Sequence, residues 1–223
     1  MDDAFAWDTV HKKTHHEEKW HSGYAEEVEK NFPAGGLVVD LGAGTGGDAL
    51  YFLQKGHRVV ALDISQFALD VLVKKAKSQN LDKGLAVKQA DFGLHKLPIK
   101  DASADSVYSR ISLNYFESKH TTKIFSDIYR ILKPGCSAYL TFKSPDDPVE
   151  MEYLEKNATP YEPNVFIEGG MIRSRFTNTQ LKEMLKNAGL QEFQVIPKKE
   201  ELGDRREGHH PELYINEVLF TKK

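Results

Sequence analysis

The stretch VVDLGAGTGGDALYF, residues 38–52, decides the fold because it joins an apolar run to an amphipathic one through a glycine-rich turn. It contains four glycines and two aspartates. The apolar run at 37–41 predicts a short strand, and apolar residues between 49 and 53 recur at helical spacing. The stretch therefore predicts a strand, a tight turn and a helix, in that order.

The same alternation continues along the chain. Strands are expected at 58–62, 85–89, 105–109 and 137–142, and helices after Ser65, over 124–132 up to a KPG stop, and from a capping box at 177–180 to near Gly189. Strands alternating with helices predict an α/β fold with a doubly wound, mostly parallel sheet. The last apolar runs, 193–196 and 212–222, have no helix between them, which predicts an antiparallel C-terminal hairpin.

We expect a single domain at 32–223, preceded by an N-terminal helical appendage or lid at 1–31. The sequence THHE at 14–17 resembles a capping box and predicts a helix that begins there. Residues 144–175 are polar and proline-containing, which predicts an insertion or a second lid.

Composition narrows the function classes. The chain has 223 residues, a formal net charge of −3 and a single cysteine, Cys136. Such a charge offers no broad basic surface for nucleic acid, and the polar N-terminus lacks the apolar stretch of a signal peptide. We expect a cytoplasmic protein with no membrane or nucleic-acid partner. Nothing in the sequence predicts an oligomeric state.

The glycine turn admits two kinds of ligand. Gly42, Gly44 and Gly47 fit the dinucleotide fingerprint, and Asp63 follows about 20 residues later, where an acid accepts from ribose hydroxyls. However, Asp40 lies two positions before the first glycine, and its carboxylate would repel a pyrophosphate by roughly 1 to 4 kcal/mol. A cationic ligand would gain from the same carboxylate.

The motif VVDLGAGTG resembles the first motif of the class I S-adenosylmethionine-dependent methyltransferases. The resemblance runs over 38–142 and includes, in order, ALDIS, ADF, DSVYS and LKPGC. It departs from the family at Cys136, where a second glycine is usual. The resemblance implies a Rossmann-like, seven-stranded sheet, S-adenosylmethionine as cofactor and methyl transfer as the activity. A looser resemblance is to small-molecule methyltransferases of the tellurite-resistance and thiopurine type.

The resemblance also implies roles for single residues. The turn and Asp40 would hold the methionine moiety, Asp63 both ribose hydroxyls, and Asp91 the adenine amine, with Ile64 and Phe92 against the adenine ring. The implied cofactor-binding set is Asp40, Gly42, Ala43, Gly44, Gly46, Asp63, Ile64, Asp91, Phe92 and Ser109. Helix capping by Asp63, a surface turn at Asp91 and ordinary core packing of Phe92 remain open alternatives.

The methyl acceptor is expected to be a small molecule. The segment SRISLNYF after the fourth strand is apolar and aromatic, and it lacks the motifs of DNA amino- and cytosine C5-methyltransferases. Trp20, Arg110 and Tyr115 are the candidate acceptor-binding residues, and Arg173 and Arg175 could also orient an acidic substrate. In-line displacement can proceed through alignment alone, so we predict no particular catalytic acid or base.

Several alternatives stay open. A nicotinamide-dependent oxidoreductase and a non-catalytic S-adenosylmethionine sensor share the fold. His11 and His15 have metal-ligand spacing, but they lack an acidic partner motif and we expect no metal. Trp7, Trp20 and Tyr24 could pack on the cofactor crevice as parts of a lid, or Trp20 and Tyr24 could simply fix the N-terminal helix to the domain.

Overall fold

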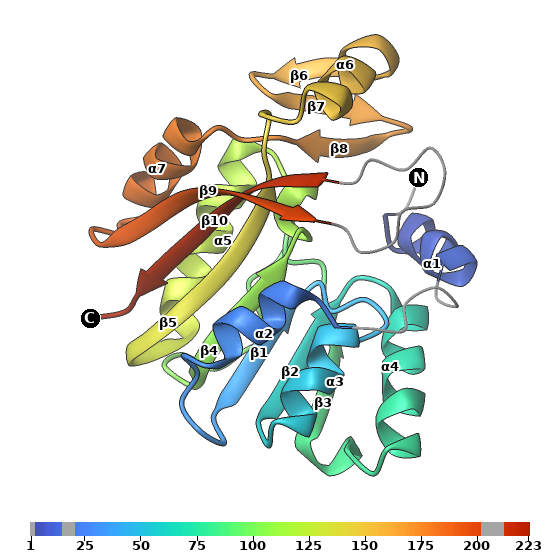
Figure 1. Ribbon diagram of the computed structural model, residues 1–223, viewed down its shortest axis with the longest axis vertical. Coiled ribbons are helices and arrows are strands. Elements are labelled where there is room, and N and C mark those ends of the chain that lie inside the picture. The colour runs from blue at the N-terminus through green and yellow to red at the C-terminus, as the bar shows by residue number, and fades with distance from the viewer. Residues whose placement is uncertain (1–2, 15–20, 202–211) are drawn as a thin grey trace. The chain divides into compact units, whose positions relative to one another are not determined.

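The computed structural model describes residues 3–14, 21–201 and 212–223 (Figure 1). In chain order the helices are α1 (Asp3–Thr14), α2 (Gly23–Glu29), α3 (Gly47–Gln54), α4 (Gln66–Ser78), α5 (Ser118–Ile131), α6 (Pro148–Asn157) and α7 (Asn178–Asn187), with 3₁₀ turns η1 (Asp82–Gly84) and η2 (Leu113–Tyr115). The strands are β1 (Leu37–Leu41), β2 (Arg58–Asp63), β3 (Leu85–Gln89), β4 (Ala104–Arg110), β5 (Leu132–Lys143), β6 (Thr159–Glu162), β7 (Val165–Glu168), β8 (Met171–Ser174), β9 (Phe193–Glu201) and β10 (Glu212–Thr221).

Seven strands form one sheet in the order β3-β2-β1-β4-β5-β10-β9. β1 pairs in parallel with β2 and β4, and β2 pairs in parallel with β3. β10 runs antiparallel to β9. The predicted α/β class, the mostly parallel sheet and the antiparallel C-terminal hairpin are therefore confirmed. Because strand order reverses beside β1, the carboxyl ends of β1 and β4 flank a topological switch point, where open α/β sheets bind ligands.

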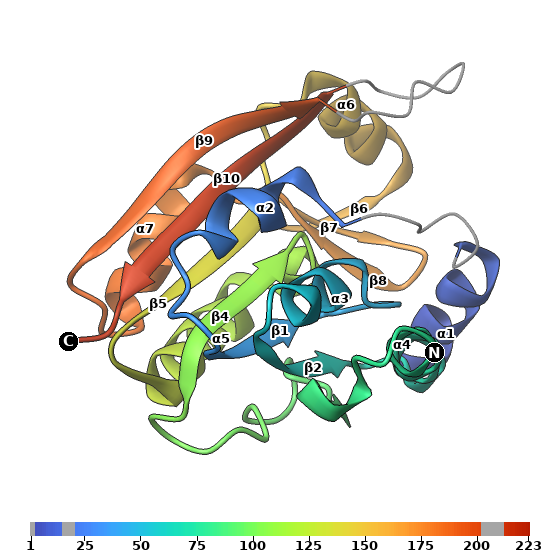
Figure 2. The ribbon, with the colours of Figure 1, turned by 60° about the horizontal axis from the view of Figure 1, so that its bottom comes forward.

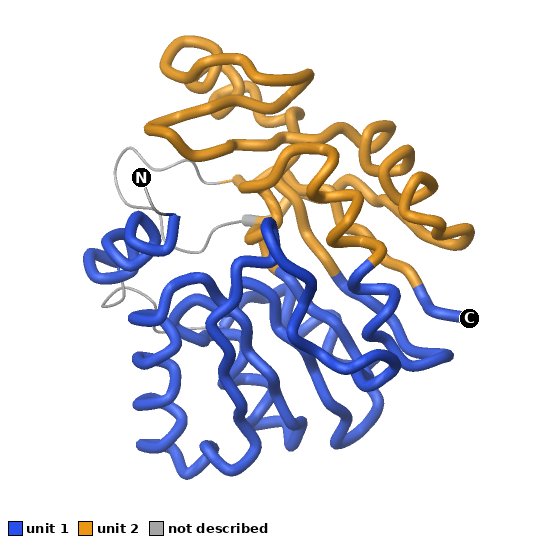
Figure 3. The backbone as a smooth tube through the Cα atoms, turned by 180° about the vertical axis from the view of Figure 1, so that it is seen from behind, with its two compact units in different colours: residues 1–109, 127–139, 221–223 blue, residues 110–126, 140–220 orange. Residues whose placement is uncertain are grey.

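The chain divides into two compact units (Figure 3). Unit 1 comprises residues 1–109, 127–139 and 221–223, and unit 2 comprises 110–126 and 140–220. Within unit 2, the segment predicted as an insertion forms α6 and a separate three-stranded sheet, β6-β7-β8, whose strands are antiparallel. The domain boundaries expected from the sequence remain predictions.

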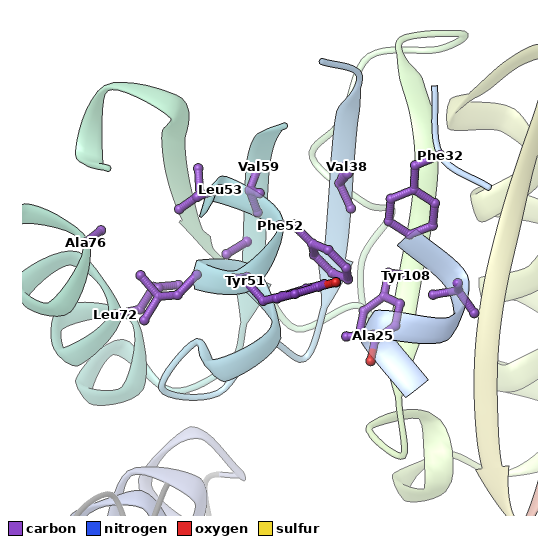
Figure 4. Packing of buried hydrophobic residues seen from close by; sticks show 14 of the residues in the cluster. Ala25, Phe32, Val38, Tyr51, Phe52, Leu53, Val59, Leu72, Ala76 and Tyr108 are labelled. Carbon is purple, nitrogen blue, oxygen red and sulfur yellow. The ribbon is translucent and has the colours of Figure 1, made fainter. Parts of the chain in front are cut away.

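The core of unit 1 lies between strands β1, β2 and β4 and helices α2, α3 and α4 (Figure 4). Phe52 of α3 meets Tyr108 of β4 edge to face, with ring centroids 5.0 Å apart. Tyr24 of α2 is 3% exposed and stacks against Tyr108 with centroids 5.8 Å apart. Tyr24 thus packs in the core, so α2 supports the βαβ unit as well as preceding it.

Two local sequence predictions are wrong. Thr14 does not have the expected role of an N-cap, and residues 15–20 after it lie outside the described residues. Thr14 lies in the last turn of α1 and its hydroxyl donates to the Val10 carbonyl at 3.1 Å. The fifth strand begins at Leu132, well before the expected residue 137, and includes the KPG sequence. Backbone bonds from Gly135 N to the Lys222 carbonyl (2.7 Å) and from Lys222 N to the Cys136 carbonyl (2.9 Å) keep this part of the chain extended.

Candidate cofactor site

The turn between β1 and α3 depends on glycine at two positions. Gly46 is the N-cap of α3 with φ of 87°, and a Cβ there would lie 2.1 Å from Leu72 Cδ1 of α4. Gly44 has φ of 53°, and its Cβ would lie 3.3 Å from His11 Cε1. Only glycine accepts this backbone at no steric cost. The glycines therefore let the turn approach α4 on one side and α1 on the other.

Three carboxylates surround this turn and share one electrostatic environment. Asp40, near the carboxyl end of β1, is 3% exposed. Its burial, and then the charges of Asp48 and Asp63, raise its pKa well above the ordinary value of 3.8. A cation bound here would relieve the repulsion among the three groups, whereas a phosphate would add to it. The ligand that this site favours is positively charged near Asp40.

Asp63 ends β2 and is 6% exposed. Its Oδ2 accepts from Gly44 N at 2.8 Å and its Oδ1 accepts from Ser65 N at 2.8 Å. Burial raises the pKa of Asp63, while those backbone bonds and the nearby His11 oppose the rise. Each carboxylate oxygen has a second lone pair. Asp63 thus fixes the glycine turn and can still accept from ligand hydroxyls, so the local-capping and ribose roles are compatible.

Asp48, in the first turn of α3, ties three elements together. Its Oδ1 accepts from Ser22 N at 2.6 Å, and its Oδ2 accepts from the Tyr108 hydroxyl at 2.6 Å and the Ser22 hydroxyl at 3.0 Å. Ser22 is the N-cap of α2. Burial and the Asp48 charge raise the pKa of Tyr108, so its phenol remains a donor. Asp48 therefore holds α2 and β4 against the start of α3.

Helix α1 lies alongside α4, as two views show (Figure 1, Figure 2). Asp8 Oδ1 accepts from the Ser65 hydroxyl at 2.5 Å and from Phe67 N at 3.2 Å, at the N-terminus of α4. One turn further on, His11 is buried between Trp7, whose ring centroid is 5.9 Å away, and Gly44. Within the described residues His11 Nδ1 has no hydrogen-bond partner. α1 thus places a buried imidazole beside Gly44 and Asp63.

The other predicted cofactor residues end or follow strands of the same sheet, with Ile64 after β2, Asp91 and Phe92 after β3, and Ser109 near the end of β4. Asp91 Oδ1 accepts from Gly93 N at 2.9 Å and Leu94 N at 3.2 Å, so part of this carboxylate stabilises its own turn. Phe92 and Ile64 are half-buried. Ser109 is fully buried and donates to the Leu41 carbonyl at 2.9 Å, which joins the ends of β4 and β1. Contact of these residues with a cofactor stays a prediction.

The structure describes two of the three candidate acceptor-binding residues, Arg110 and Tyr115. Trp20 lies outside the described residues. Arg110 forms an ion pair with Glu200 at 2.7 Å, which already uses part of its guanidinium. Tyr115 is half-buried in η2, and the Arg173 guanidinium lies over its ring, 5.1 Å from the centroid. These contacts alone do not identify Arg110 or Tyr115 as an acceptor-binding residue.

Asp8 and Asp48 are site residues that sequence reasoning missed, and it considered His11 only as a possible metal ligand. Asp48 stands inside the quoted glycine-rich stretch, and an acid in the first turn of the predicted helix was an available signal. Asp8 and His11 act through contacts with residues more than 30 positions away, for which the local pattern holds no signal.

The family comparison now decides between the ligands. Residues 38–135 match a family described as "Methyltransferase domain". These residues are similar to the methyltransferase domain family, and the fold is that of class I S-adenosylmethionine-dependent methyltransferases. The nicotinamide-dependent oxidoreductase considered from the sequence has no support from this match. The glycine turn, Asp40 and Asp63 all lie inside the matched residues.

Curated relatives of this domain differ in what they methylate. Dimethylglycine N-methyltransferase of Parasynechococcus marenigrum is 34% identical over 126 residues, which are 55% of this chain and 43% of that relative. The tRNA N(3)-methylcytidine methyltransferase Mettl2 of Drosophila melanogaster is 26% identical over 164 residues, 71% of this chain and 50% of that relative. The chain spans no more than half the length of either relative.

Solved structures confirm the fold of the methyltransferase domain. An S-adenosylmethionine-dependent methyltransferase of Methanosarcina mazei has a TM-score of 0.70 at 21% identity, covering 88% of this chain and 96% of that one. TehB of Haemophilus influenzae has a TM-score of 0.67 at 18% identity, covering 91% and 63%. At these identities the likeness concerns the fold and not the substrate.

The described residues contain neither a candidate metal cluster nor a helix that could span a membrane. No three His, Cys, Asp or Glu side chains in this part of the chain gather as a possible metal site. His15, one of the two spaced histidines, is outside it. Where the structure is described, no helix combines the length and apolar character needed to cross a bilayer.

Proposed function

We propose that this chain binds S-adenosylmethionine in the site around the glycine turn and transfers its methyl group to a small-molecule acceptor. The observation that carries the proposal is the convergence of buried Asp40 and Asp63 on the glycine turn, where Asp63 bonds to Gly44 N. These carboxylates suit a ligand that has a ribose and positive charges but no phosphate.

Each residue of the site has a task in this proposal. Asp40 and the backbone of Gly42, Ala43, Gly44 and Gly46 hold the methionine end, where the Asp40 carboxylate attracts the cationic groups. Asp63 accepts from the ribose hydroxyls while its bonds to Gly44 N and Ser65 N hold it in place. When bound, the cofactor supplies an electrophilic methyl group on a sulfonium. The protein's contribution is then alignment and exclusion of water, which need no dedicated base.

A small-molecule acceptor is favoured by the charge of the chain. A formal net charge of −3 provides no broad positive surface for a nucleic-acid backbone. The dimethylglycine-specific relative points the same way, while the tRNA-specific relative keeps RNA as the competing acceptor. A non-catalytic sensor of the cofactor is the remaining alternative, and only a turnover measurement separates it from an enzyme.

We further propose that α1 closes over the bound cofactor. Asp8 fixes α1 to the N-terminus of α4, and this places His11 beside the two residues, Gly44 and Asp63, that would hold the cofactor. The unpartnered Nδ1 of His11 is a buried polar atom that a ligand hydroxyl could satisfy. The lid is thus the helix over residues 3–14, and α2 belongs to the core.

Isothermal calorimetry with S-adenosylmethionine, S-adenosylhomocysteine and NADH tests the cofactor. We expect the first two to bind and NADH not to bind, and tighter binding of NADH than of S-adenosylhomocysteine would reject the assignment. Methyl transfer from radiolabelled S-adenosylmethionine to a panel of small amines, thiols and acids, with bulk tRNA as a further acceptor, then tests the substrate class. Labelling of tRNA alone would overturn the small-molecule acceptor, and binding without any turnover would favour the sensor.

A further inference from the structure

Unit 2 contains a half-buried cluster of charged and aromatic side chains that the cofactor site does not use. Tyr115 belongs to η2, directly after β4, and Lys143 is the last residue of β5. Arg173 on β8 and Glu150 on α6 complete the cluster together with Arg175. Because Tyr115 follows the carboxyl end of β4 and Lys143 forms that of β5, the cluster belongs to the end of the sheet where α/β enzymes bind substrates.

Two cations of this cluster, Arg175 and Lys143, already form hydrogen bonds within the protein. Arg175 is 4% exposed, and it donates to the Ser174 carbonyl at 2.7 Å and to Glu150 Oε1 at 2.8 Å. Lys143 Nζ donates to the same Glu150 oxygen at 2.6 Å. Burial raises the pKa of Glu150, but the bonds from Arg175 and Lys143 outweigh burial and lower it. Glu150 is therefore ionised and neutralises one charge of the pair.

Arg173 is held differently. Its Nε donates to Glu168 Oε2 at 2.8 Å, and its guanidinium carbon lies over the Tyr115 ring, 5.1 Å from the centroid, within the range of a cation–π contact. Its side chain is 18% exposed. Within the described residues the two Nη groups of Arg173 make no hydrogen bond. Glu168 and Tyr115 thus fix the plane of the guanidinium and leave its terminal donors for another partner.

The turn that carries Tyr115 is itself firmly positioned. Ile111 has φ of 47°, which is strained for a β-branched residue. The Asn114 side chain holds the turn, because it donates to the Ile111 carbonyl at 2.7 Å and accepts from Lys143 N at 2.8 Å. Strain of this kind is kept where surrounding bonds over-determine the backbone, often at functional sites. Burial also raises the pKa of Tyr115, so its phenol stays a donor.

We propose that Arg173 binds an oxyanion of the methyl acceptor, so that the acceptor is a small organic acid. Two parallel Nη–H donors match a carboxylate or a phosphate monoester in a bidentate pair. The geometry selects Arg173 over Arg110 and Arg175, whose guanidinium groups are engaged with Glu200 and Glu150. This inference rests on the proposed methyl transfer for its biological meaning, but the anion site can be measured without turnover.

The experiment uses benzoate, phenyl phosphate and the neutral benzamide as probes of the full-length protein, alone and saturated with S-adenosylhomocysteine. We expect wild-type protein to bind benzoate or phenyl phosphate at least about tenfold more tightly than benzamide, since a charged hydrogen-bonded pair is lost with the amide. The better of the two anions identifies the group. Equal binding of all three probes, or none, would overturn the proposal without the use of any variant.

Variants then locate the site. Arg173→Met should abolish the preference for the anion, a loss of about ten- to a hundredfold, and Arg173→Lys should keep part of it because it retains the charge but not the paired donors. Arg58→Met, at the exposed amino-terminal end of β2, is the matched control and should behave as wild type. An anion preference that survives in Arg173→Met would refute the assignment to this residue.

The outcome is separable from that of the proposed function. S-adenosylhomocysteine affinity should be the same in wild type and Arg173→Met, which also reports on folding. Failure of the wild type to bind S-adenosylhomocysteine contradicts the methyltransferase proposal alone. In turnover assays with paired acids and amides, Arg173→Met should raise the KM of the acid with a smaller change in kcat, whereas a merely structural role would lower both activities alike.

Discussion

The hydrogen bonds of Asp8 allow the free energy with which α1 docks on α4 to be estimated. Asp8 accepts two hydrogen bonds from the N-terminus of α4, from the Ser65 hydroxyl and from Phe67 N. Bonds to a charged acceptor contribute about 1.5–3 kcal/mol, and an anion at a helix N-terminus about 0.3–1 kcal/mol. Asp8→Ala should therefore weaken the docking of α1 by roughly 2 kcal/mol, taking a value near the lower end of these ranges.

The structure limits the side effects of this substitution. The Ser65 hydroxyl still accepts from Ala68 N at 3.1 Å, so α4 keeps its own cap when Asp8 is removed. If the cofactor binds fully only to the docked helix, its apparent affinity falls by the loss in docking, which for 2 kcal/mol is about 30-fold at most. Deletion of residues 1–14 sets the upper limit, because it removes α1 and leaves α2 in the core.

Calorimetry with S-adenosylhomocysteine on wild type, Asp8→Ala and the 1–14 deletion measures the effect, after thermal melts establish that each is folded. Asp3→Ala, an exposed acid in the first turn of the same helix, is the matched control and should bind within about twofold of wild type. Unchanged affinity in both the Asp8→Ala and deletion proteins would refute the lid. Tighter binding in either would mean that α1 obstructs the site.

Three further outcomes follow from the cofactor site. Asp40→Asn should raise the free energy of unfolding of the ligand-free protein at neutral pH, because burial and the Asp48 and Asp63 charges hold the folded-state pKa of Asp40 above its ordinary 3.8. Ionisation of Asp40 lowers the stability of the folded state as the pH rises above 3.8. The stability gained by Asp40→Asn should therefore disappear below that pH in urea titrations. A gain in stability that persists there would have another cause. The same variant should bind S-adenosylmethionine more weakly in calorimetry. Gly46→Ala should lower the free energy of unfolding by about 1–3 kcal/mol more than Gly189→Ala, because both have positive φ but only the first meets Leu72; equal losses in urea would show that the contact is easily relieved. Asp63→Asn offers one acceptor oxygen to two backbone donors, so it should cost about 1–3 kcal/mol of stability in addition to weakening S-adenosylhomocysteine binding; a variant as stable as wild type would contradict that account.

The parts of the fold predicted correctly are those whose signals are local. The strand at 37–41, the cap at Ser65 and the capping box at Thr177 need only neighbouring residues, and the structure has each of them. The early start of β5 was missed because its extension depends on pairing with Lys222, far away in the chain. The cap expected at Thr14 was misread because a threonine can equally bond back to its own helix, as it does to Val10.

The candidate site divides in the same way. The glycine turn, Asp40 and Asp63 were predictable, since turn geometry and charge dictate those residue types. The choice among the arginines was not, because only the packed structure shows that Arg110 is paired with Glu200 while Arg173 is held by Glu168 and Tyr115. The contacts of Asp8 with α4 and of His11 with the glycine turn could not be predicted for the same reason. Sequence identifies the chemistry of a ligand more readily than the helix that is proposed to cover it.

The position of β10 has a consequence for how the chain folds. β10 follows β9 in sequence, yet it lies between β5 and β9 in the sheet. The β9–β10 hairpin can form from nearby residues, whereas pairing of β10 with β5 must close a long loop that contains α6, β6–β8 and α7. The pairings of β1 with β2 and of β2 with β3 join residues much closer in the chain, such as Leu37 with Arg58 and Val59 with Leu85, and are free of that delay. We therefore expect amide hydrogens of β1 and β2 to become protected early during refolding, and those of β5 and β10 to gain protection together in a later, slower phase.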